Sequence, residues 1–411
     1  MESTISPPQE RRFVDVSNSS ALSSRDFLVY LIGSTISLHG LWVYRVALGW
    51  FAWQLTGSEF WVGMVAFTQF APAVFFGPVF GVLADRVDRR KASIVINSCS
   101  AVNMLLLGAL AATGKVDIVV LTVVSLVQGA FDGAHTPVRM TLVPNLVTKE
   151  QLQSAIANTS ISFNVSRFVG PAIAGVIIAT LGVSAAFAFN GISYLAIVAA
   201  VFFVKLRPIA SREKRPGDVW SELLDGVRYV LEHHTIRGLL IMIAVASVFG
   251  RGALEMLPAI ADAVLNRGSS GLATLTSAIG VGAVATGLVL SRSTLWLNIK
   301  VIRISVVLAG LLIAAFGANT SFWLAVPIAT ILGVILSMGG VGSQILIQGL
   351  VDDDVRGRVS SLWGMIAFGG TALGGLLVGA SAHTLGLQNT IIVAGLLCSV
   401  AALIPRYTDT H

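Results

Sequence analysis

Apolar residues along this chain form long blocks that are separated by short polar segments. A helix that crosses a bilayer needs about 20 mostly apolar residues. Twelve blocks approach or exceed that length, so we predict an all-α membrane protein with twelve transmembrane helices. In order, the blocks cover 26–55, 60–84, 92–113, 118–139, 155–180, 184–205, 236–260, 271–291, 300–317, 322–348, 358–380 and 389–405.

The basic residues predict which side of the membrane each connecting segment faces. Of 27 Lys and Arg residues, two lie in predicted outer loops (Lys115 and Arg267). Three more lie well inside blocks, far from their ends (Arg45, Arg167 and Arg251), and the others fall at or near the opposite side. Because basic loops stay in the cytoplasm, both termini are predicted to be cytoplasmic. This distribution explains the net charge of +6 without a nucleic-acid partner.

Two long polar segments divide the chain into regions. Residues 1–24, rich in Ser, Pro and charge, predict a disordered cytoplasmic tail, and 406–411 a second tail. Residues 206–235 begin with a basic cluster and continue with apolar residues at helical spacing. That pattern predicts an amphipathic helix on the inner membrane surface, within a cytoplasmic linker. The linker joins two six-helix bundles, 25–205 and 236–405.

The two halves of the sequence resemble each other. A shift of 206 positions places Arg45 on Arg251. A shift of 204 positions places Gly170 on Gly374 and one Thr-Leu-Gly run on a second. We therefore predict two pseudo-symmetric repeats of six helices, with a binding site between them near the membrane midplane.

A short charged segment separates the second and third blocks. It reads Gly81-Val-Leu-Ala-Asp85-Arg86-Val-Asp88-Arg89-Arg90-Lys91, whereas its flanks, 60–84 and 92–113, carry no Lys, Arg, Asp or Glu. Charges held between two membrane-spanning runs predict a tight loop at the membrane surface. The spacing resembles the loop between helices 2 and 3 of the major facilitator superfamily, whose members are secondary transporters.

The resemblance extends over about residues 25–405, and the first half is similar to the enterobactin-exporter-like branch. It implies that Asp85 locks the cytoplasmic side by accepting hydrogen bonds from the start of helix 11. Three residues depart from the pattern: Asp88 stands where the family has Gly, Ser125 where it has a helix 4 Arg, and Ala174 where the helix 5 antiporter pattern has the first of two adjacent glycines. The segments that carry the resemblance are Val46–Trp50, Leu55–Ser58, Gly81–Lys91, Pro144 with Leu146 and Val147, and Gly170, Pro171 and Gly175. The expected conformational latch is Gly81, Asp85, Arg86, Arg89 and Arg90.

A polar stripe follows one face of the fourth block. Gln128, Asp132, His135 and Arg139 occupy positions i, i+4, i+7 and i+11. A charge inside the membrane costs at least about 2.5–3.5 kcal/mol, so it needs a partner or a wet cavity. Burial favours the protonated form of a carboxyl group, which makes Asp132 the first candidate for proton coupling. A permanent ion pair between Asp132 and Arg167 is the open alternative.

The seventh block has a second charged face. Ser247, Arg251 and Glu255 lie at i, i+4 and i+8, and Pro258 predicts a kink one turn later. Glu255 is the second proton-coupling candidate, and Arg251 is expected to contact substrate. A local Arg251–Glu255 pair that only cancels charge is equally open.

Arg45 is expected to face its repeat mate Arg251 across the outer half of the cavity. Three arginines against two carboxylates within the blocks favour an anionic or polyhydroxylated substrate over a lipophilic cation. Pairing of Arg45 with Glu255 would leave no such cationic site. The other expected cavity residues are Gln128, His135 and Gln344, the last on a polar face that membrane helix packing also explains.

The sequence shows no nucleotide-binding loop, metal cluster or catalytic nucleophile set. We therefore expect no cofactor, no metal and no enzymatic activity, with energy drawn from an ion gradient. The predicted function is export of a small organic solute across the inner (plasma) membrane by alternating access, coupled to protons, by a monomer. The alternatives are proton-symport uptake and a transport-dead sensor or scaffold with this fold.

Overall fold

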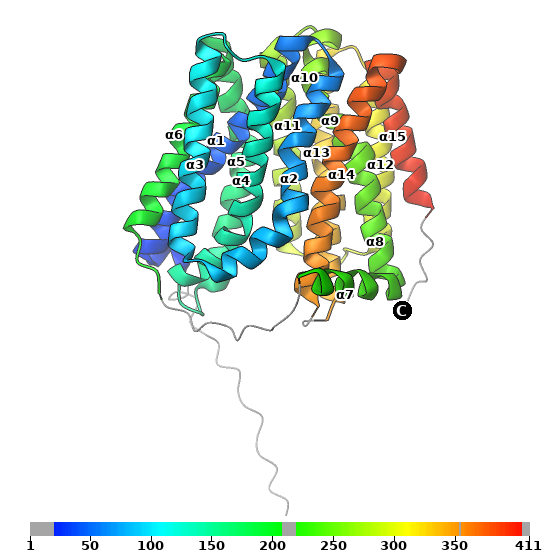
Figure 1. Cartoon of the computed structure of the whole chain (residues 1–411). Coiled ribbons are helices and arrows are strands. Elements are labelled where there is room, and N and C mark those ends of the chain that lie inside the picture. Colours follow the sequence, from blue (N-terminus) through cyan, green and yellow to red (C-terminus); the bar gives the residue numbers. More distant parts are fainter. Residues whose placement is uncertain (1–19, 208–218, 353–354, 405–411) are drawn as a thin grey trace, which may run out of the picture.

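The structure, a computed structural model, describes residues 20–207, 219–352 and 355–404, apart from the side chains of 77–86, 136, 141 and 219–223. These ranges contain helices and no strand (Figure 1). The first half comprises α1 (Arg25–Thr56), α2 (Glu59–Arg86), α3 (Arg89–Ala112), α4 (Ile118–Leu142), α5 (Leu152–Leu181) and α6 (Val183–Phe203). The second half comprises α8 (His234–Val245), α9 (Gly252–Leu254), α10 (Leu257–Ala259), α11 (Gly268–Arg292), α12 (Ile299–Ala318), α13 (Phe322–Leu350), α14 (Arg356–Leu385) and α15 (Leu387–Leu403). Between the halves, α7 (Val219–Glu232) lies across one end of the bundle.

Within the described ranges, 11 helices are long and apolar enough to cross a membrane. One of them is a broken span that runs from His234 to Val264 and includes α8, α9 and α10. The twelfth apolar block corresponds to α15, which has 17 residues and is shorter than the other spans.

Side chains at the helix starts explain where several of these helices begin. Asp88 accepts a hydrogen bond from the Lys91 backbone N–H at 2.8 Å and so caps α3. Asp117 caps α4 in the same way through Val120 N at 2.8 Å. An acidic N-cap satisfies an otherwise unpaired N–H and suits the positive end of the helix dipole. This is the role of the carboxylate that departs from the family loop pattern.

The two halves repeat the same helix pairing. In the first half α3 packs against α6 and α2 against α4; in the second half α12 packs against α15 and α11 against α13. A contact also repeats at residue level, because a Cβ at Gly170 would overlap Trp42 Cβ, and one at Gly374 would overlap Val248 O. Trp42 and Val248 differ by 206 positions, the shift that relates Arg45 to Arg251. The repeat seen in the sequence is therefore present in the packing.

The structure shortens the predicted N-terminal tail. Residues 1–19 lie outside the described residues, but a short 3₁₀ helix, Ala21–Ser23, is placed against the bundle. Ala21 is fully buried, and its N–H donates to Ser154 Oγ at 3.1 Å. Burial of Ala21 thus gives residues 20–24 a fixed place that their polar composition does not predict. In the predicted linker, 208–218 lies outside the described residues, as does 406–411 at the C-terminus.

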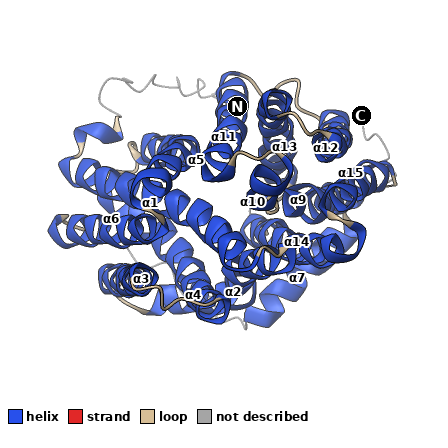
Figure 2. Ribbon diagram, turned by 90° about the horizontal axis from the view of Figure 1, so that it is seen from above, coloured by secondary structure: helices blue, strands red, loops and turns tan. Residues whose placement is uncertain are grey.

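The halves lie side by side when the bundle is viewed from above, with α2 packed against α14 and α11 against α5 (Figure 2). At the end opposite α7, Trp53 Nε1 donates to Asp262 Oδ2 at 2.8 Å, which joins α1 to the broken span. Towards the middle, the rings of Phe70 and Phe368 stack with centroids 6.2 Å apart. The halves are thus closed together from the end opposite α7 to the level of this aromatic pair.

Candidate transport site

Asp132 is held by a hydrogen-bond network that joins three helices of the first half. Its Oδ1 accepts from Gln128 Nε2 at 3.0 Å and from Tyr194 Oη at 3.3 Å. Gln128 also donates to Tyr194 Oη at 3.0 Å, and its Oε1 accepts from Asn103 Nδ2 at 3.2 Å. Gln128 is fully buried. The network fixes the direction of the Asp132 carboxyl group on α4.

The guanidinium of Arg45 lies between aromatic rings of α1 and α2. Its Cζ is 4.8 Å from the centroid of Trp42 and 5.3 Å from that of Phe70. Such rings attract a cation through their electron-rich faces and partly replace lost hydration. The charge of Arg45 interacts with those of Asp132 in the first half and Glu255 in the second. The charge of Arg45 therefore acts on both carboxyl groups that the sequence singled out.

Arg167 on α5 joins the same cluster. Its Cζ is 5.6 Å from the Trp42 ring, and its charge interacts with those of Arg45 and Arg251. In the part of the chain that the structure describes, Arg167 and Asp132 do not form an ion pair within 4.0 Å. Two arginines, Arg45 and Arg167, thus lie against one tryptophan ring, and the like charges of Arg45 and Arg251 act on Arg167 unfavourably.

Arg251 and Glu255 lie in the broken span. A π-helical segment, Ala246–Arg251, precedes α9, and a second one, Ile260–Val264, follows α10. Pro258, which has no N–H to donate, is the second residue of α10, as the predicted kink requires. π-Helical turns inside membrane helices occur frequently at functional sites. The irregular backbone places Arg251 and Glu255 at longer range than a 4.0 Å ion pair, although their charges interact.

A small cavity lies beside Arg251, between the broken span, α13 and α14. Its volume is about 10 Å³, room for about one water molecule, and Arg251 and Ser247 supply polar groups to its wall. Gly340 on α13 makes room for the guanidinium, because a Cβ there would lie 2.5 Å from Arg251 Nη2. Trp363 closes another side and donates through Nε1 to Ser343 Oγ at 3.4 Å.

The remaining predicted site residues, His135, Arg139 and Gln344, lie on α4 and α13. His135 and Arg139 continue the α4 stripe. Gln344 is half-buried on α13, one turn beyond Gly340. Among the described residues, no group of three His, Cys, Asp or Glu side chains is arranged to hold a metal ion.

The expected conformational latch is described only in part. Gly81, Asp85 and Arg86 end α2, and their side chains lie outside the described residues. Arg89 Nη1 donates to Asn145 Oδ1 at 3.0 Å, and Arg90 Nη2 donates to the carbonyl of Val204. These two arginines tie the start of α3 to the ends of α4 and α6.

Sequence reasoning missed four residues of this site, namely Trp42, Asn103, Tyr194 and Asp262. Trp42 and Tyr194 belong to types that are ordinary in apolar blocks, so they gave no signal. Asn103 is a polar residue inside the third block, and its distance from Gln128 in sequence hid the contact. Asp262 follows the predicted end of the seventh block and was assigned to a loop.

The fold agrees with the comparison to protein families. Residues 16–409 match the family described as transmembrane secretion effector, within the major facilitator superfamily. The chain belongs to this family. It is therefore a multi-pass membrane transporter of the major facilitator type, as the loop motif indicated.

Characterised relatives of similar length include exporters. A staphyloferrin A transporter of Staphylococcus aureus (strain NCTC 8325 / PS 47) is 25% identical over 377 residues, covering 91% of each chain. Macrolide efflux protein A of Streptococcus pyogenes is 22% identical over 382 residues, covering 92% of this chain and 94% of that one. An enterobactin exporter of Escherichia coli O1:K1 / APEC is 25% identical over 416 residues, covering 93% and 94%. The predicted similarity to the enterobactin-exporter branch is confirmed.

Solved structures support the fold. A bacterial homologue of the human lysosomal transporter Spinster, in an inward-facing and occupied conformation, superposes with a TM-score of 0.72 at 14% identity. The match covers 94% of this chain and 96% of that one. The nucleoside transporter NupG gives a TM-score of 0.70 at 14% identity, covering 92% and 97%.

Proposed function

We propose that this transporter exports a small organic anion across the inner (plasma) membrane in exchange for protons, by alternating access and as a monomer. The observation that carries the proposal is the cluster in which Arg45 interacts with Asp132 of one half and Glu255 of the other. A charge shared between two halves that move against each other can link protonation to the movement.

We also infer that the chain crosses the membrane twelve times, with both termini in the cytoplasm. The short helix α15 packs against α12 as α6 packs against α3, so it takes the place of a sixth helix in the second half. A hydrophobic stretch shorter than the bilayer is accommodated at modest cost by local thinning. With an even number of spans and the basic loops on the α7 side, the α7 end of the bundle is cytoplasmic.

Buried hydrogen-bond donors support an anionic substrate. Arg45 Nε and Trp42 Nε1 are buried without a hydrogen-bond partner in the described structure. A buried donor without an acceptor costs about 1–3 kcal/mol, which a carboxylate or similar oxygen acceptor on a substrate would recover. The excess of arginine over carboxylate in the cluster favours the same charge. Export is supported by the relatives described as exporter and efflux protein.

The closed packing at the end opposite α7 is what an inward-facing state of the cycle needs. Asp85 and Arg86 would act in the other state, where the resemblance places a cytoplasmic lock involving the start of α14.

The function is tested with the purified chain in proteoliposomes and a panel of four probes. The panel comprises salicylate as an aromatic anion, glucose as a neutral sugar, erythromycin as a macrolide and tetraphenylphosphonium as a lipophilic cation. We expect salicylate to accumulate when the vesicle interior is the more acidic side, because exchange lets protons leave as the anion enters. Salicylic acid crosses the bilayer unaided towards the more alkaline side, so only accumulation above that in protein-free vesicles with the opposite gradient would indicate symport. Failure of all probes to move or bind would favour a sensor or scaffold.

We expect Trp53→Phe to open the end opposite α7. The change keeps the ring but removes the N–H donated to Asp262. A hydrogen bond of this kind contributes about 1 kcal/mol, so the outward-open population should rise about fivefold. Spin labels at Leu55→Cys and Ser270→Cys, in a Cys99→Ser background with Cys398 buried, report the separation.

Trp323→Phe is the matched control for this variant, because Trp323 is 75% exposed near the same end of the bundle. It should leave the distance distribution of the two labels unchanged. An unchanged distribution in Trp53→Phe would mean that this hydrogen bond does not hold the gate closed.

A further inference from the structure

An apolar groove lies beneath the linker helix, at the α7 end of the bundle. It is formed by α7, α8 and α14, and its volume is about 240 Å³. Apart from Arg237, every described residue that lines it is apolar. Val227 and Leu231 of α7, Leu240 and Ile241 of α8, and Leu362 and Ile366 of α14 form most of its wall. A groove of this composition offers water too few polar partners and suits a hydrocarbon chain.

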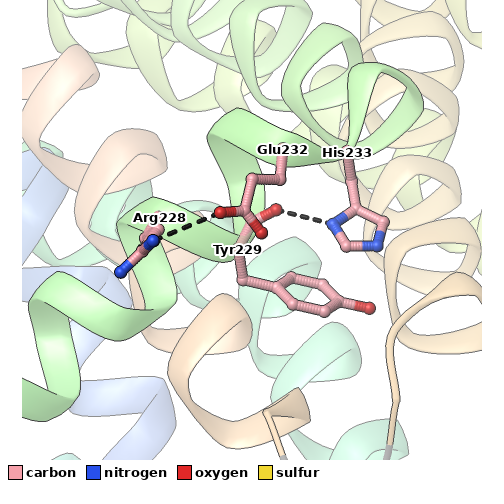
Figure 3. Close-up of polar contacts among 4 residues, drawn as sticks. All are labelled: Arg228, Tyr229, Glu232 and His233. Carbon is pink, nitrogen blue, oxygen red and sulfur yellow. Dashed lines mark hydrogen bonds and ion pairs between the residues drawn. The ribbon is translucent and has the colours of Figure 1, made fainter.

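Polar contacts hold α7 over the groove. Asp225 pairs with Arg358 of α14 at 3.6 Å, and Tyr229 Oη donates to Asp352 Oδ2 at 3.2 Å. Figure 3 shows Arg228 paired with Glu232 along the helix, and His233 turned back towards the carbonyl of Tyr229. The helix is thus fixed to the second half through its polar face. Its apolar residues Val227 and Leu231 remain 36% and 56% exposed above the groove.

One cation stands at the rim of this groove. Arg237 Nη1 donates to Leu231 O at 3.1 Å, and Nη2 lies 2.7 Å from His234 Nδ1. A guanidinium has five N–H donors, so Arg237 keeps donors for a further acceptor. The nearest acid on α7, Glu232, is already paired with Arg228. The rim therefore suits a group that carries negative charge and planar-spaced oxygens, as a phosphate does.

We propose that this groove binds one anionic phospholipid of the inner leaflet, with an acyl chain beneath α7 and the phosphate on Arg237. The inference rests on the membrane orientation proposed above, which places α7 at the cytoplasmic surface. An amphipathic helix lies at the depth where headgroups and acyl chains meet. Basic residues there attract anionic lipids. The acyl chains of a zwitterionic phospholipid fill the groove equally well. Its headgroup, however, also carries a cation, which would lie near Arg237 and His234 and would bind less favourably there.

The groove and the cavity beside Arg251 lie on two faces of α14. Leu362 and Ile366 of α14 face the groove, whereas Trp363 and Ala367 line the cavity beside Arg251. A bound acyl chain therefore supports, from outside, the helix contact that positions Arg251. The lipid is expected to stabilise the folded chain and to raise the transport rate.

The test measures thermal unfolding of the full-length protein in detergent with added phosphatidylglycerol or phosphatidylcholine of identical acyl chains. We expect phosphatidylglycerol to raise the Tm more, because a ligand that binds only the folded state stabilises it by mass action. Arg237→Gln should weaken phosphatidylglycerol binding about tenfold, the loss of one charged hydrogen bond. Lys149→Gln removes an exposed cation between α4 and α5, away from the groove, and as the matched control it should keep the preference.

Two further variants define the site and keep the test informative if Arg237→Gln misfolds. Val227→Trp fills the groove from an exposed position and should reduce the response to both lipids. If Arg237→Gln is unstable, Arg237→Lys serves instead; it keeps the charge and should keep the preference for phosphatidylglycerol.

Equal shifts with both lipids in the wild type, or an undiminished preference in Arg237→Gln, overturn the proposal. A response to glycerol phosphate alone that equals the response to the lipid overturns the acyl-chain part. None of these measurements depends on transport, so the lipid site and the transport function fail independently.

Discussion

Replacing Asp132 with Asn should reduce gradient-driven accumulation of the transported probe to the level of protein-free vesicles. Asn is isosteric and can still accept at Oδ1 from Gln128 Nε2 and Tyr194 Oη, so the network around it survives. It cannot bind and release a proton, so a pH gradient can no longer drive the cycle. Exchange of labelled for unlabelled probe at equal concentration needs no gradient and should persist.

Asp117→Asn supplies the matched control for this prediction. Asp117 begins the same helix and acts as its N-cap, a role that Asn fills equally well. We expect accumulation by this variant to match the wild type. If Asp132→Asn also accumulates the probe normally, Asp132 has no part in coupling, and Glu255 becomes the remaining candidate. If accumulation and exchange are both lost while binding is intact, the carboxylate instead serves the conformational change.

The part of this fold that the sequence predicts is the part set by the bilayer. Charged loops and apolar blocks are both consequences of the cost of placing polar groups in hydrocarbon, so they identify helices and their sides. The loop from Gly81 to Lys91, with the other segments that match the family pattern, indicated the family. The last block shows how closely this holds, because 389–405 and α15 (Leu387–Leu403) have the same length of 17 residues.

The details of the site are not set by the bilayer, and they were harder to predict. A polar stripe on α4 identified Asp132 and Gln128, but nothing in one helix indicates that Tyr194 and Asn103 complete their hydrogen bonds. Pro258 indicated a kink, whereas the π-helical turns that reorient Arg251 depend on packing against other helices. Contacts between helices that are distant in sequence decided these features.

A substitution at the glycine contact between α14 and the broken span is expected to have the second large effect, on folding stability and on transport. A Cβ at Gly374 would overlap the carbonyl oxygen of Val248 and lie 2.7 Å from its carbon. Gly252 of α9 packs against the same point of α14, because a Cβ added at Gly252 would lie 2.5 Å from Gly374 Cα. Backbone stands on both sides, so no side-chain rotation can relieve the overlap.

Gly374→Ala is therefore expected to force α14 away from the broken span and to displace Arg251 and Glu255. Overpacking of this kind costs about 1–3 kcal/mol of folding free energy. We expect earlier unfolding in a detergent titration and loss of accumulation even in the protein that folds. Because the repeat mate Gly170 meets Trp42 Cβ in a similar way, Gly170→Ala should disturb the aromatic support of Arg45.

Gly364→Ala separates this packing effect from the general effect of adding a methyl group to α14. A Cβ at Gly364 would have no neighbour within 4 Å, and Ala favours a helix over Gly by about 1 kcal/mol. The control should therefore unfold no earlier than the wild type and should transport normally. Wild-type stability and transport in Gly374→Ala would show that the helices separate at this contact during the cycle with little cost. In that case the glycines would mark a moving surface, and the position of Glu255 would not depend on their close approach.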